Sequence, residues 1–150
     1  MGWLGSLFGL RKNRGAVIGD GHFGFHVVGT SHHQETLAAI AGGSSRESAH
    51  HYCAALVVPQ PDNPYSKHAV AVHVGGRLIG HLADDCSVDF LTALRHAGFD
   101  EAACEAMIVG GWDRGDGDQG SFGVRLNARI PFRFESADQW QQGHTSARRR

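Results

Sequence analysis

Long hydrophobic runs are absent from this chain of 150 residues. No apolar stretch approaches the roughly 20 residues that span a bilayer, and the start of the chain lacks the cleavage site of a signal peptide. We therefore expect no stable membrane insertion. An apolar cluster at helical spacing precedes a basic stretch, which predicts that residues 1–14 contact a partner protein or a membrane surface, or dock on their own domain. The cluster comprises Trp3, Leu4, Leu7, Phe8 and Leu10.

Motifs of the common enzyme and metal sites are also missing. The chain has no GxxxxGK[ST], HExxH or GxSxG sequence, so we expect a protein that is not an enzyme. Its 11 histidines include adjacent pairs, but neighbouring strand residues face opposite sides, and no third ligand stands at a recognisable spacing. Asp113, Asp116 and Asp118 resemble part of a calcium loop, but Val124 replaces its closing glutamate. No metal and no cofactor are expected.

The chain has few cysteines and a small net charge. Three widely spaced cysteines, Cys53, Cys86 and Cys104, form no CxxC motif, which favours reduced thiols and a cytoplasmic location. The formal net charge is −1, with +3 on each of the segments 1–18 and 129–150. Residues 19–128 hold six basic and 13 acidic side chains, a net charge of −7. This acidic middle predicts weak electrostatic attraction to nucleic acid.

Glycine is abundant, with 21 residues, whereas there are only four prolines. Apolar patterning predicts strands near residues 23–28, 52–58, 69–74, 78–82, 103–112 and 121–130, and helices over residues 34–41 and 86–97. Gly75 and Gly76 predict a tight hairpin with positive φ in the turn. These elements favour a mainly β fold, a small antiparallel OB-like β-barrel or half-barrel with two short helices.

The same pattern suggests how the chain is divided. Its length favours one domain. Residues 1–22 are predicted to be an apolar and basic segment with a linker, residues 23–134 the folded domain, and residues 135–150 a disordered tail that ends in arginine. Residues 44–51 are predicted to be a polar loop, and Asp85 is predicted to start the second helix.

Residues 56–82 carry a recognisable pattern, LVVPQPDNPYSKHAVAVHVGGRLIGHL. Its prolines restrict φ in the turn, and Asp62 and Asn63 can accept hydrogen bonds from backbone amides. This stretch resembles the signature of the HIRAN domain family, approximately L-x-P-x-P-x-N-P-Y-D-x-x-A-V-x-V, then G and V-G-Y/H-L. The similarity spans about residues 25–134, because VVGTSHHQETLAAIAGG and GSFGVRLNARI look like segments of bacterial members. It implies an OB-like barrel that binds the 3′ end of single-stranded DNA, in the context of DNA repair.

The resemblance also implies candidate nucleic-acid-binding residues. Asn63 and Tyr65 match the family's pocket loop, and His81 matches the position before leucine. Phe122 falls where an aromatic side chain of the last hairpin closes the pocket, and Arg125 is a candidate phosphate contact. Each also has a structural explanation: Asn63 builds the turn, Tyr65 and Phe122 belong to the core, and His81 is a half-buried strand residue. For Phe122 the core explanation is favoured.

Several positions depart from the family pattern. Ser66 replaces the aspartate that would accept a hydrogen bond from the terminal hydroxyl, and His32 and His33 replace paired tyrosines. Acidic Asp84 and Asp85 stand where basic residues would contact phosphate. Lost cations and added anions both weaken phosphate binding.

Two functions from different classes are therefore consistent with the sequence. The motif favours a non-enzymatic domain that recognises single-stranded DNA 3′ ends. The charge distribution favours the same fold acting as a protein-interaction or tethering module, through the apolar N-terminal segment and the arginine tail, residues 148–150.

Overall fold

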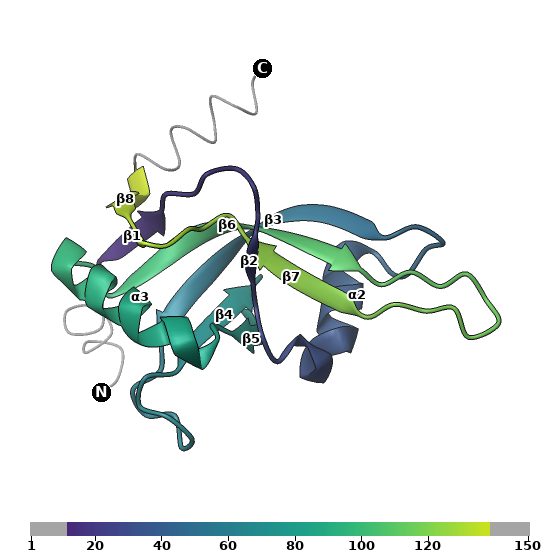
Figure 1. Cartoon of the computed structure of the whole chain (residues 1–150), viewed down its shortest axis with the longest axis horizontal. Helices are drawn as coiled ribbons and strands as arrows, with labels where there is room; N and C mark the ends of the chain where they lie inside the picture. Colours follow the sequence, from purple (N-terminus) through teal and green to yellow (C-terminus); the bar gives the residue numbers. More distant parts are fainter. Residues whose placement is uncertain (1–11, 139–150) are drawn as a thin grey trace, which may run out of the picture.

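The computed structural model describes residues 12–138, and these form a mainly β fold with a strongly curled sheet (Figure 1). Hydrogen-bonded neighbours follow the order β2-β7-β6-β3-β4-β5, all antiparallel. These strands are β2 (Phe25–His26), β3 (Ala49–Pro59), β4 (Val70–Val74), β5 (Arg77–His81), β6 (Glu101–Gly110) and β7 (Phe122–Leu126). The predicted fold class, a small antiparallel OB-like barrel or half-barrel, is confirmed.

One residue pair joins the two edges of the curled sheet. The backbone N–H of Val28 donates to the carbonyl of His81 at 2.9 Å, and the N–H of His81 donates to the carbonyl of Val28 at 2.9 Å. Val28 follows edge strand β2, and His81 ends edge strand β5. This pair therefore closes the barrel at one point.

Helices cover the two ends of the barrel. A 3-10 helix, η1 (Thr30–His33), leads into α2 (Gln34–Ala41), which buries Leu37, and α3 (Asp84–Ala97) buries Phe90 and Leu94. Figure 1 shows α2 and α3 at opposite ends of the sheet. Both helices end at a glycine in the left-handed conformation, Gly42 and Gly98, because glycine has no Cβ to oppose it. Among the described residues no helix is long and apolar enough to cross a membrane.

The β4–β5 hairpin follows the sequence prediction. Gly75 and Gly76 have φ values of 59° and 79°, and Val74 pairs with Arg77 across them. Positive φ at both central residues gives the turn a twist that matches the strands. Strands β6 and β7, which form in the segments predicted as strands near residues 103–112 and 121–130, pair as a second hairpin. Cys53, Cys86 and Cys104 are free thiols, as expected, and burial raises the pKa of Cys104 to about 12.

Two short strands lie where the sequence predicted a linker and a disordered tail, so these predictions are wrong at those residues. Residues 12–22 contain β1 (Arg14–Val17), which runs parallel to β6, and the tail prediction overlaps β8 (Phe134–Ser136), which pairs with β1. The Nε–H of Arg14 donates to Glu101 at 2.8 Å and anchors β1 to the sheet. The contact predicted for residues 1–14 and the remaining tail prediction fall mainly outside the described residues.

Three further boundaries differ from the prediction. Strand β3 begins at Ala49, inside the segment predicted to be a loop, because its pairing with β6 continues to Gly110. The first strand is shorter than residues 23–28, and β2 comprises only Phe25–His26. Helix α3 begins at Asp84 with Ala83 as its N-cap, so Asp85 lies within the first turn.

Candidate nucleic-acid interface

The turn between β3 and β4 is held by its own polar side chains. Asn63 Oδ1 accepts hydrogen bonds from the N–H groups of Tyr65 at 2.8 Å and Ser66 at 3.2 Å. Ser66 Oγ accepts from the N–H of His68 at 3.1 Å. Short side chains that bond to nearby amides fix the backbone of such turns. The sequence prediction that Asn63 caps amides here is confirmed.

This rigid turn presents Tyr65 to solvent. The side chain is 95% exposed, so the ring is not part of the core. Ser66, next to it, is half-buried, and its hydroxyl lies within the same turn. An exposed ring on an ordered backbone is a suitable platform for stacking against a base.

Gln60 connects this turn to strand β5. Its side-chain carbonyl oxygen accepts a hydrogen bond from Asn63 Nδ2 at 3.1 Å and another from His81 Nε2 at 2.9 Å. His81 is half-buried, and its backbone forms the pair with Val28 that closes the barrel. The candidate pocket loop and His81 are thus parts of one hydrogen-bonded unit.

His81 lies among other ionisable groups. Burial lowers its pKa below the ordinary value, and the charges of His33 and His73 lower it further, while Asp84 opposes them. His33, at the end of η1, therefore lies within electrostatic range of His81. Among the described residues no group of three His, Cys, Asp or Glu side chains is arranged to hold a metal ion.

The remaining candidates are more dispersed. His32 is exposed on η1. Arg125 pairs with His26 of β2, while Val28, two residues further along, pairs with His81. One strand therefore separates Arg125 from His81 on the barrel wall. The Nε atom of Arg125 is buried, and no described group accepts a hydrogen bond from it.

Phe122 is largely buried at the start of β7. Its side chain is only 5% exposed and belongs to the core with Val124 and Leu126. Gln34 fixes the local backbone, since its Oε1 accepts from the N–H of Phe122 at 2.8 Å and its Nε2 donates to the Phe122 carbonyl at 2.9 Å. The core explanation favoured for Phe122 is therefore confirmed, and its assignment to the nucleic-acid site stays a prediction.

Sequence reasoning missed Gln60 and His73. No residue pattern distinguishes Gln60 from another polar residue between two prolines. His73 was not predictable from the Gly75-Gly76 turn alone, because a bulge between the pairs His73–Leu78 and Val72–Gly80 shifts the register before β5 reaches His81.

Comparisons with known proteins found no relative of this chain. No family model matches the chain, and no curated protein and no solved structure is similar to it. The likeness to HIRAN domains therefore rests on the residues of the sequence alone.

Proposed function

We propose that this domain binds the 3′ end of single-stranded DNA without catalysing a reaction. The observation that carries the proposal is the ordered turn that holds Tyr65 95% exposed and is hydrogen-bonded through Gln60 to His81. A terminal base stacks on the Tyr65 ring, and an imidazole and the Ser66 hydroxyl bond to the end of the strand. Stacking on an aromatic platform contributes about 1–3 kcal/mol per base.

Electrostatics limit the affinity of this site. Asp84 lies within electrostatic range of His81, and it would repel a phosphate there. Few phosphates are neutralised, so the dependence of binding on salt should be shallow. Stacking and hydroxyl recognition, rather than charge, then provide the selectivity for an end.

The test compares an oligothymidine that has a free 3′ hydroxyl with the same strand blocked by a 3′ phosphate. We expect tighter binding of the free end, loss of this preference in Tyr65→Ala, and a sharper preference in Ser66→Asp, which restores an acceptor for the hydroxyl. Tyr52→Ala is the matched control, because Tyr52 is also an exposed tyrosine and lies on β3, outside the turn. Equal binding of both ends by the unaltered protein would refute the proposal.

A protein-interaction module is the second candidate function. The acidic side chain beside His81 favours it, because a carboxylate at the candidate phosphate position opposes DNA binding. Equal affinity for free and blocked ends, with retained folding, is the result that would leave this candidate in place.

A further inference from the structure

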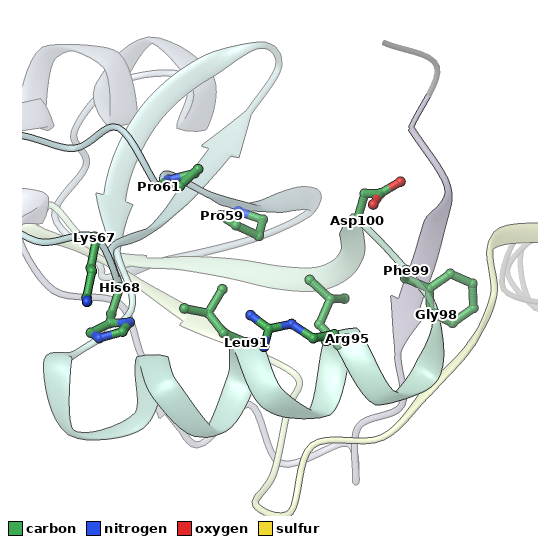
Figure 2. Close-up of a pocket in the computed structure, with 10 residues that line it drawn as sticks. Pro59, Pro61, Lys67, His68, Leu91, Arg95, Gly98, Phe99 and Asp100 are labelled. Atoms are coloured by element: carbon green, nitrogen blue, oxygen red, sulfur yellow. The ribbon is translucent and has the colours of Figure 1, made fainter. Parts of the chain in front are cut away.

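A groove of about 680 Å³ lies between α3 and the turn after β3, next to but distinct from the candidate DNA site. Pro59, Pro61 and Leu91 give it an apolar floor, while Lys67, His68 and Arg95 contribute basic groups. Figure 2 shows Lys67 and His68 above one end of the helix, and Arg95 extended along it beside Leu91. Neither Tyr65 nor His81 lines this groove.

The basic side chains of the groove have no acidic partners among the described residues. Lys67 and Arg95 are exposed, and no carboxylate of residues 12–138 forms an ion pair with either. Asp100 is the one carboxylate among the described lining residues, and it accepts a hydrogen bond from the N–H of Asn13 at 2.8 Å. The groove therefore combines an apolar floor with two unpaired cations, and it is complementary to an anionic ligand.

The side chains of the floor distinguish between two kinds of anionic ligand, single-stranded nucleic acid and an acidic peptide. Single-stranded nucleic acid needs aromatic rings on which bases can stack. Phe99 is the aromatic lining residue besides His68, but its ring packs against Phe134 at 6.4 Å between centroids, and Gly15 lies against it. The prolines and Leu91 instead offer aliphatic surface, which suits an apolar side chain of a peptide.

We propose that this groove docks a short acidic segment of a partner protein. An aliphatic side chain of the segment packs on Pro59, Pro61 and Leu91, and carboxylates on either side of it bind Lys67 and Arg95. Arginine is well suited to this role, since its guanidinium binds a carboxylate through two parallel hydrogen bonds. The site is separate from the DNA-end site, and the two share only the turn that follows β3.

The experiment titrates the full chain with the peptide acetyl-Asp-Glu-Leu-Leu-Asp-Glu-amide, using amide NMR shifts to locate the site and labelled-peptide anisotropy to measure affinity. We expect shifts at Lys67, Leu91 and Arg95, and weaker binding at higher salt. The double variant Lys67→Gln with Arg95→Gln should bind roughly tenfold more weakly, as expected for the loss of charge-assisted hydrogen bonds. Arg77→Gln is the matched control, because Arg77 is an exposed arginine at the β4–β5 hairpin.

Several results would overturn the proposal. They are the absence of shifts in the groove at millimolar peptide, equal binding of the neutral peptide acetyl-Asn-Gln-Leu-Leu-Asn-Gln-amide, and an equal loss of affinity in Arg77→Gln. Displacement of the peptide by oligothymidine, lost in the double variant, would assign the groove to nucleic acid instead. Tyr65→Ala should leave peptide binding unchanged, so failure of the DNA-end proposal is distinguishable from failure of this one. Circular dichroism of each variant verifies that it is folded.

Discussion

Replacing Phe122 by alanine is expected to destabilise the fold rather than remove a ligand contact. The ring is 5% exposed, packs in the core and lies against Gly111, where an added Cβ would overlap it. Truncating a buried phenylalanine to alanine costs about 3–5 kcal/mol, a large share of the roughly 5–15 kcal/mol that holds a domain together. The midpoint of thermal unfolding should therefore fall by roughly 10 °C or more. Phe122→Leu keeps most of the volume and should cost only about 1 kcal/mol.

Urea unfolding followed by circular dichroism measures both free energies, and the titration with free and blocked oligothymidine is repeated on Phe122→Leu. A core role predicts that this variant keeps the same preference for a free end as the unaltered protein. A cost below about 1 kcal/mol for Phe122→Ala, together with loss of end preference in Phe122→Leu, would show that the ring faces a ligand and that the reasoning is wrong.

Three further predictions concern pH, the hairpin and the thiols. Folding lowers the pKa of His81, chiefly by burial and then by the charges of His33 and His73, so the unfolded chain binds the proton more readily. The free energy of unfolding should therefore fall as the pH drops below 6.5 toward the folded pKa. Urea titrations at several pH values measure this dependence, and His81→Gln should reduce it. Gly76→Ala forces a side chain into a positive φ of 79° and should cost about 1–2 kcal/mol by urea unfolding, whereas Gly24→Ala, in open space, should cost far less. Cys104, with its pKa raised to about 12, should not react with iodoacetamide at pH 8 in the native protein but should react in urea, which mass spectrometry would detect. Modification of Cys104 in the native protein would contradict its burial.

The elements that the sequence predicted correctly are those specified by local chemistry. The hairpin at Gly75 and Gly76 needs two adjacent residues that tolerate positive φ, and α3 ends at Gly98 for a similar reason. Phe122, Val124 and Leu126 alternate on the buried face of β7, which agrees with the core explanation favoured for Phe122.

The elements that the sequence did not predict depend on pairing between distant residues. Strand β1 has four residues and pairs with β6 and β8, whereas β8 has three residues and pairs with β1, so all of these partners lie far away in the sequence. Segments this short carry no periodicity that separates them from a linker or a tail. For the candidate site, the turn at Asn63 was predictable from its own residues, whereas the contact of Gln60 with His81 depends on how β5 lies beside the turn.

The single backbone pair at the seam of the barrel also governs how the molecule opens. Strands β3 and β6 are paired along their length, so separating them requires breaking many hydrogen bonds, whereas among the described residues Val28 and His81 alone join β2 to β5. Local opening follows the regions with the fewest such bonds, so the amides of Val28 and His81 should exchange with solvent deuterium before those of the β3–β6 ladder. A ligand that contacts His81 only in the closed barrel would slow this exchange and shift the population toward the closed form.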